Sequence, residues 1–140
     1  MIRALVDTNV ILDVFLRREP HYADAARLWE ANLKGEYEAW VSAITPINVV
    51  YIGRKFKDAE SLREAIRGLL ATHKVCTLSR EILNAALTLP VKDFEDAVQI
   101  AGALAHQLDA IVTRDKNDFS GSSLPVYTPS ELLALLESPT

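Results

Sequence analysis

Cysteine is almost missing from this sequence of 140 residues, in which Cys76 is the only one. A single cysteine cannot form an internal disulfide, so the sequence excludes an extracellular scaffold held by disulfides and suits a reducing compartment. The run from Val75 to Leu78 around it is apolar. We therefore expect Cys76 to be a small buried hydrophobe rather than a catalytic thiol.

Long uncharged apolar runs are also missing. The first sixteen residues are largely apolar, but Arg3, Asp7 and Asp13 interrupt them. A signal peptide and a membrane span both need an unbroken apolar stretch, so neither is predicted. We expect a cytoplasmic protein without a membrane partner.

An excess of positive charge is the third absence. The net charge is −4, which argues against a protein that coats nucleic acid with a basic surface. A nuclease needs only a local basic patch that contacts a few phosphates. Candidates for such a substrate-binding patch are Arg17, Arg18, Arg54, Lys55 and Lys57. A solvated surface face is the alternative interpretation.

Short apolar strands alternate with amphipathic helices along one domain, residues 1–140. Strands are predicted at 2–6, 38–41, 75–78, 110–113 and 125–127. Helices are predicted near 10–15, 22–33, 45–55, 61–73, 79–89, 93–108 and 130–137. This order predicts an α/β fold with three α/β/α layers and a central, mostly parallel sheet of about five strands.

Two of these strands end directly in an aspartate, at Asp7 and at Asp115. A third acid, Asp96, lies in the first turn of a helix, where exposed N–H groups favour an anion. Asp118 follows Asp115 in a polar turn whose composition alone is typical of any loop. Because ligands bind at the carboxyl ends of strands in open α/β sheets, we expect these acids to converge on one pocket.

Such a cluster is unfavourable by itself, since two carboxylates about 5 Å apart repel by roughly 3 kcal/mol at an effective dielectric of about 20. Either some carboxyls stay protonated or a cation lies among them. Oxygen-only ligands indicate Mg²⁺ or Mn²⁺ rather than zinc, and such an ion suits phosphodiester hydrolysis. The scattered His21, His73 and His106 are expected to be structural or surface residues.

Each acid also has a purely structural interpretation. Asp7 could cap the helix that follows it. Asp93 lies three residues before Asp96, so the two could form the N-cap and reciprocal half of a capping box. We read Asp13 and Glu95 as solvated helix residues.

Four segments resemble a known family, the PIN-domain nucleases, which include the VapC-like toxins of toxin–antitoxin pairs. The segments are L-V-D-T-N at 5–9, V-S-A-I-T-P-I-N at 41–48, D-F-E-D-A at 93–97 and I-V-T-R-D-K-N-D-F at 111–119. The first motif alone is weak, but all four occur in this order and at appropriate spacing, over nearly the whole length of the chain, and together they are specific.

The resemblance implies a metal-dependent endoribonuclease on a PIN-like fold. It assigns the ion to Asp7, Asp96 and Asp115, with Asp118 beside them. It further implies that Thr8, Asn9 and Thr113 line the pocket as hydrogen-bonding groups. Family analogy also implies single-stranded or structured RNA as the substrate, a small antitoxin as a partner, and a homodimer.

One position departs from the family pattern. Most members have a glutamate in the first turn of the helix after the second strand, where this sequence has Asn48, as one branch of the family does. Asparagine keeps a carbonyl oxygen but removes one negative charge, so we expect weaker metal binding than in relatives with glutamate. Alternatively, Asn48 is a hydrogen-bonding residue near Thr45, the predicted N-cap that precedes Pro46.

Two other functions compete with the nuclease. A haloacid-dehalogenase-like phosphotransferase would use Asp7 as its nucleophile, but those enzymes usually have D-x-D, and here Asn9 takes the second position. A non-catalytic RNA-binding or protein-interaction module on the same fold is supported by Asn48. The remaining carboxylates argue against it, because a pure binder of a polyanion gains nothing from concentrated negative charge.

Overall fold

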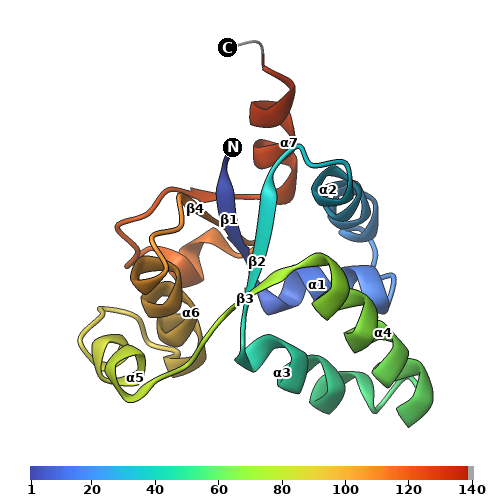
Figure 1. Cartoon of the computed structure of the whole chain (residues 1–140), viewed down its shortest axis with the longest axis horizontal. Helices are drawn as coiled ribbons and strands as arrows, with labels where there is room; N and C mark the ends of the chain where they lie inside the picture. The colour runs from blue at the N-terminus through green and yellow to red at the C-terminus, as the bar shows by residue number, and fades with distance from the viewer. Residues whose placement is uncertain (139–140) are drawn as a thin grey trace.

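In the computed structural model, which describes residues 1–138, a five-stranded sheet has helices on both faces (Figure 1). The strands are β1 (Arg3–Val6), β2 (Glu38–Ser42), β3 (Lys74–Cys76), β4 (Ala110–Val112) and β5 (Val126–Tyr127). The helices are α1 (Thr8–Phe15), α2 (Tyr22–Leu33), α3 (Ile44–Gly53), α4 (Ala59–Thr72), α5 (Arg80–Leu87), α6 (Phe94–Ala105), α7 (Pro129–Glu137) and the short 3₁₀ helix η1 (Lys116–Phe119).

The strands are arranged in the order β3-β2-β1-β4-β5, and every neighbouring pair is parallel. The carboxyl ends of all five strands therefore lie at one edge of the sheet. Strand β1 occupies the centre, between β2 and β4. The predicted fold class is confirmed, and its topology brings the ends of β1 and β4 side by side.

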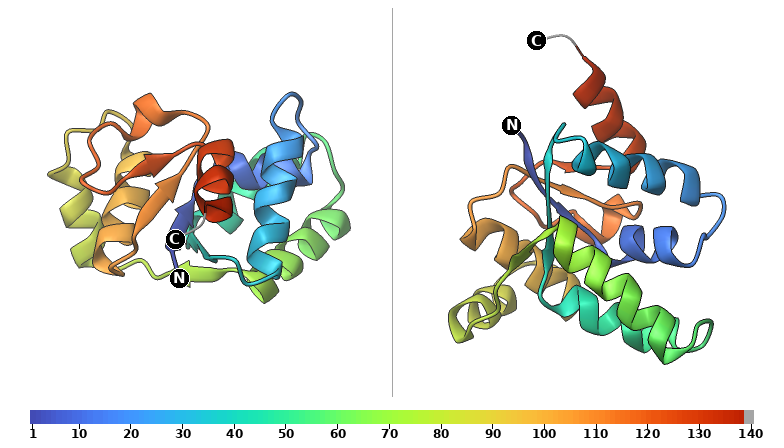
Figure 2. Two further views of the ribbon diagram at one scale, coloured as in Figure 1. Left: turned by 90° about the horizontal axis from the view of Figure 1, so that it is seen from above. Right: turned by 45° about the vertical axis from the view of Figure 1, so that its right-hand side comes forward.

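Alternate residues of β1 supply two separate cores, because successive side chains of a strand point to opposite faces. Ala4 and Val6 pack with residues of α1, α2, α3, α4 and α7. Leu5 faces the other side and packs with α6, including Ile100 and Ala103. Figure 2 shows the helices divided between the two faces of the sheet.

The start of α3 differs from the prediction. Its N-cap position is Ala43, without a side-chain cap, whereas Thr45 is fully buried inside the first turn. The Thr45 hydroxyl lies 2.8 Å from the Thr8 hydroxyl. The predicted N-cap at Thr45 is wrong, because a tertiary partner takes its hydroxyl and the helix begins earlier.

Cys76, His73 and His106 make contacts inside the fold, as expected. Cys76 is buried, and burial raises the pKa of its thiol to about 12. His106 contacts Thr77, and His73 lies beside Trp29, with ring centroids 4.5 Å apart. Within residues 1–138 no helix is both long and apolar enough to cross a membrane.

Buried His73 makes folding stability sensitive to acid. Burial lowers the pKa of His73 from 6.5 to about 4. The unfolded chain binds the proton more readily, so stability is lost as the pH falls from 6.5 through 4, by up to about 3 kcal/mol. We expect His73→Phe to lose less stability than the native protein between pH 7 and pH 4.5 in urea unfolding. An equal loss in both proteins would contradict this role.

Candidate active site

Asp7 joins the end of β1 to the start of α1 and is 3% exposed. It occupies the N-cap position of α1, yet its side chain makes no capping hydrogen bond. Instead, Oδ1 accepts a hydrogen bond from Nε2 of Gln99 at 3.0 Å, and Oδ2 accepts one from Oγ1 of Thr113 at 2.9 Å. The helix-capping interpretation of Asp7 is therefore wrong, and its carboxylate is held at the edge of the sheet.

Thr113 connects Asp7 to the loop that follows β4. Its buried hydroxyl donates to Asp7 and also accepts a hydrogen bond from the backbone N–H of Asp115 at 3.0 Å. One side chain thus fixes both the orientation of the Asp7 carboxylate and the position of the Asp115 backbone. The structure places Thr8 differently, with its hydroxyl paired to that of Thr45.

Gln99 is a site residue that the sequence prediction missed. It is fully buried in α6, and its Oε1 has no hydrogen-bond partner within residues 1–138. A buried amide that is only half satisfied is costly unless it has a role. The available sequence indication was that Gln99 is the one polar side chain in the run from Ala97 to Ala105.

The first turn of α6 brings further acids to the same edge. Asp93 is its N-cap, as one prediction had it, and its Oδ1 accepts a hydrogen bond from the backbone N–H of Asp96 at 3.0 Å. The half-buried Asp96 carboxyl has a pKa raised to about 7. Burial is the main cause, followed by repulsion from Asp93, Asp7 and Asp118.

The pKa of Asp7 is also raised, to about 6. Burial is again the main cause; the hydrogen bonds from Gln99 and Thr113 oppose it, and the charge of Asp115 adds to it. Asp7 and Asp96 therefore each repel other acids of the predicted set. The four acids share one electrostatic environment, in which ionisation of one carboxyl hinders ionisation of the next.

Asp115 and Asp118 are exposed, on the loop after β4 and on η1. A hollow between α6 and η1 is lined by acids of both elements, among them Asp93, Asp96 and Asp118. In the side-chain positions of residues 1–138, no three acidic, histidine or cysteine side chains are grouped closely enough to hold an ion. The charges of these acids thus affect one another, but their side chains do not form a coordination shell.

Asn48 lies on α3, and its side chain is next to that of Glu95 on α6. Its Nδ2 is buried and makes no hydrogen bond within residues 1–138, so the predicted bond near Thr45 is not formed. Glu95 is half-buried, so its reading as a solvated residue is wrong. Burial raises the pKa of Glu95, and the Asn48 side chain opposes that rise. A carboxylate from α6 therefore lies beside Asn48, the position at which the resemblance leads us to expect a glutamate.

Asp13 was also expected to be solvated, and that expectation is wrong. It is 1% exposed, its Oδ1 accepts a hydrogen bond from Nε of Arg18 at 2.8 Å, and its Oδ2 lies 3.4 Å from Nε of Arg114. The same Arg18 donates through Nη2 to the carbonyl oxygen and the Oδ1 of Asn9. Asn9 is therefore engaged with an arginine.

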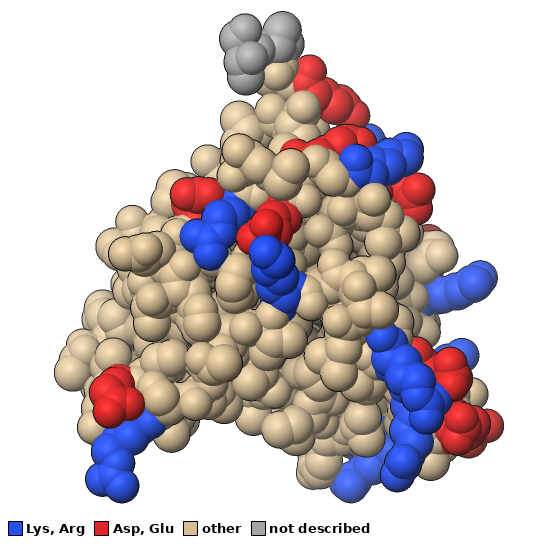
Figure 3. Space-filling view, viewed as in Figure 1, with Lys and Arg blue, Asp and Glu red and all other residues tan. Residues whose placement is uncertain are grey.

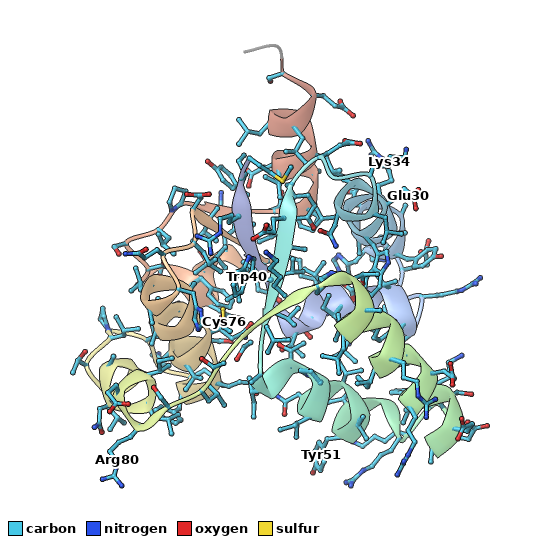
Figure 4. The ribbon with its side chains drawn as sticks, in the orientation of Figure 1. Glu30, Lys34, Trp40, Tyr51, Cys76 and Arg80 are labelled. Atoms are coloured by element: carbon cyan, nitrogen blue, oxygen red, sulfur yellow. The ribbon has the colours of Figure 1, made fainter. Side chains whose placement is uncertain are left out.

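The predicted basic patch lies elsewhere. Figure 3 shows basic side chains gathered where α3 and α4 meet, beside acidic ones. Arg54 lies 4.1 Å over the ring of Tyr51, which points outward from α3 (Figure 4). Arg17 lies 5.7 Å from the ring centroid of Tyr22, and Lys55 is exposed. None of these three cations lines the hollow between α6 and η1.

A family model that matches most of the chain identifies its family. The model described as "PIN domain" matches residues 3–117, which include Asp7, Asp96 and Asp115. This chain belongs to the PIN domain family. Membership gives no support to the haloacid-dehalogenase-like alternative. No curated protein matches the sequence.

Several solved structures resemble this PIN domain. A toxin–antitoxin complex from Klebsiella pneumoniae is 27% identical, with a TM-score of 0.68 over 90% of this chain and 97% of that one. DNA-bound VapBC from Salmonella typhimurium is 16% identical, with a TM-score of 0.69 over 92% and 99% of the two chains. VapC20 from Mycobacterium tuberculosis, a toxin that cleaves the sarcin-ricin loop, is 13% identical, with a TM-score of 0.64 over 77% and 86%. The last two show a shared fold alone.

Proposed function

We propose that this PIN domain protein is a metal-dependent endoribonuclease that hydrolyses RNA phosphodiester bonds and acts as the toxin of a toxin–antitoxin pair. The observation that carries the proposal is the electrostatic coupling of the acids at the carboxyl edge of the sheet, in which Asp7 feels the charge of Asp115, and Asp96 feels the charges of Asp7 and Asp118. Two of these acids have pKa values raised well above the ordinary range. Such raised pKa values mean that the ionised carboxylates are unfavourable by themselves and would be stabilised by a bound cation.

The donor set fits Mg²⁺ or Mn²⁺, because it consists of carboxylate oxygens, the ligands that these hard ions prefer. Asp7, Asp96 and Asp115 would hold the ion, with Asp118 beside them. When bound, such an ion supplies a water of lowered pKa and stabilises negative charge on a phosphate. Asp115 and Asp118 are exposed side chains, so they are free to turn toward the buried Asp7.

Side chains of the protein orient the Asp7 carboxylate. Gln99 and Thr113 hold both oxygens of the Asp7 carboxylate, so this acid is fixed before a substrate arrives. Thr113 also fixes the backbone at Asp115. Preorganised polar groups of this kind avoid reorganisation during the reaction.

An antitoxin partner is supported by the relatives, since the similar structures include toxin–antitoxin complexes. The surface offers an apolar hollow between α1, α3 and α4, lined in part by Phe15, Val49 and Leu62. An apolar segment of a small antitoxin would fit such a groove. The exposed apolar side chains of Ile47 and Tyr51 on α3 offer area to a second copy, as a homodimer requires.

The test is cleavage of a mixed panel of structured RNAs by the purified protein in Mg²⁺, in Mn²⁺ and in EDTA. We expect endonucleolytic fragments with either metal and none in EDTA. Binding of the panel without cleavage in any metal would favour the non-catalytic module instead. Cleavage that persists in EDTA would contradict the role of the carboxylates.

We expect Asn48→Glu to bind Mn²⁺ about tenfold more tightly than the native protein, because an added carboxylate increases the charge of the ligand set. The same change places a second acid beside Glu95 and so lowers the metal-free melting temperature. Asn48→Gln is the matched control, since glutamine has the shape of glutamate without the charge. Calorimetry in which Asn48→Glu and Asn48→Gln bind Mn²⁺ equally would refute the hypothesis.

A further inference from the structure

Arg114 directly precedes Asp115 in the chain, and its side chain lies between the carboxylates of Asp13 and Asp115. The guanidinium Nε is 3.4 Å from Oδ2 of Asp13 and 3.9 Å from Oδ2 of Asp115. The side chain is 24% exposed, so it is anchored from within and reaches the surface. The other cation that lines the hollow around Asp115 and Asp118 is Lys116, and its Nζ is paired with Glu131 at 3.1 Å.

The hydrogen-bonding capacity of Arg114 is unused. The side chain makes no hydrogen bond within residues 1–138, and its Nε is buried without a partner. A guanidinium has five N–H donors in a planar fork that matches the oxygens of a phosphate. A partly exposed arginine whose N–H donors have no partner can bind an anion from solution.

Arg18 provides an internal comparison, because it binds the same carboxylate. Its Nε donates to Asp13, and its Nη2 donates twice to Asn9. Its donors therefore serve the fold and tie α1 to the turn that follows it. Asp13 has one negative charge and is paired with two arginines, so these three side chains together keep one net positive charge. The N–H donors that remain without a partner are those of Arg114.

The surface around Arg114 continues the acidic site. Arg114 lines a hollow together with Asp115, Asp118 and Thr128. It also lines a second hollow, together with Asp13 and Ser130. A strand that places one phosphate at the acids would therefore bring a neighbouring phosphate past the guanidinium.

We propose that Arg114, held in place by Asp13, binds an RNA backbone phosphate next to the one that is cleaved. This proposal rests on the proposed ribonuclease function and assigns a substrate contact to it. The contact also explains how a chain of net charge −4 retains a polyanion at a cluster of acids. Asp13 is a positioning residue in this arrangement, since it does not touch the phosphate and orients the guanidinium that does.

The test measures binding apart from cleavage. A fluorescein-labelled RNA hairpin is titrated with the full chain carrying Asp96→Asn, with and without Arg114→Gln, at several salt concentrations. We expect Arg114→Gln to weaken binding about tenfold and to reduce the slope of log affinity against log salt by about 0.7–0.9, as the loss of one phosphate contact requires. Arg114→Lys should keep the slope but bind more weakly, because it retains the charge without the planar fork.

Arg18→Gln is the matched control, because it removes a guanidinium from the same carboxylate. We expect it to lower the melting temperature while leaving the salt slope unchanged. Equal affinity and equal slope in Arg114→Gln would overturn the phosphate contact while the ribonuclease function stands. No RNA binding by any variant, together with no cleavage by the native protein on the RNA panel, would overturn both proposals.

Discussion

Asp7→Asn and Asp96→Asn are each expected to lose at least about 100-fold in RNA cleavage while keeping the native fold. Loss of groups that merely support metal ligands typically costs roughly 10–100-fold, and a direct ligand contributes at least as much. In Asp7→Asn, one oxygen of the oriented carboxylate becomes an N–H donor that cannot bind a cation. Initial rates on a cleaved RNA, with circular dichroism of each variant, measure the effect.

The control for these variants is Glu81→Gln, which removes an exposed acid in the first turn of α5. It changes the net charge by the same amount and should retain the native rate. If either aspartate variant keeps more than about a tenth of the native rate, that acid is not part of the catalytic site.

The metal-free protein is expected to become more stable when Asp7 is replaced by asparagine. The folded pKa of Asp7 is about 6, above its ordinary 3.8, so the folded state holds the proton more tightly. Stability is therefore lost as the pH rises from 3.8 through 6, and the loss reaches up to about 3 kcal/mol at pH 8. The Asp7→Asn variant avoids this loss, which corresponds to a melting temperature higher by on the order of 10 °C.

Thermal unfolding in EDTA at pH 4 and at pH 8 measures this difference. The two proteins should melt at similar temperatures at pH 4, where Asp7 is largely protonated, and differ at pH 8. Adding Mn²⁺ at pH 8 should stabilise the native protein and leave Asp7→Asn unchanged, because only the native protein gains from binding. A variant that is less stable than the native protein at pH 8 would show that the ionised Asp7 carboxylate does not destabilise the fold.

The strand-to-aspartate pattern was enough to place Asp7 and Asp115 at one edge of a parallel sheet. Apolar runs that end in an acid fix which end of the strand the acid follows, and parallel connections bring those ends together. The cap at Asp93 was equally local, because an N-cap depends on a side chain and a backbone N–H three residues away. Such features follow from short stretches of sequence.

The sequence did not predict contacts between distant elements. Gln99 looks like a single polar residue on the side of the helix away from its apolar stripe until the fold places it against Asp7. Thr45 looks like an N-cap until its hydroxyl meets that of Thr8. Asp13 looks solvated because polar residues on amphipathic helices usually face water, and only the approach of β4 brings Arg114 to it. Each depends on side-chain positions that no local pattern determines.

The position of Asn48 shows the same limit. By itself, an asparagine in place of glutamate predicts a weaker ion site. The structure adds Glu95 beside it, from a helix that lies far away in the sequence. The charge of the pocket is therefore a property of the assembled edge of the sheet rather than of one motif.

The most direct measurement is a calorimetric titration of the metal-free protein with Mn²⁺ at pH 8, alongside Asp7→Asn, Asp96→Asn and Glu81→Gln. The four acids are proposed to form a divalent cation site, so we expect saturable binding to the native protein and to Glu81→Gln. The heat should disappear in both aspartate variants. Binding that is undiminished in Asp7→Asn and Asp96→Asn, or absent from the native protein, would contradict a metal site at this edge of the sheet.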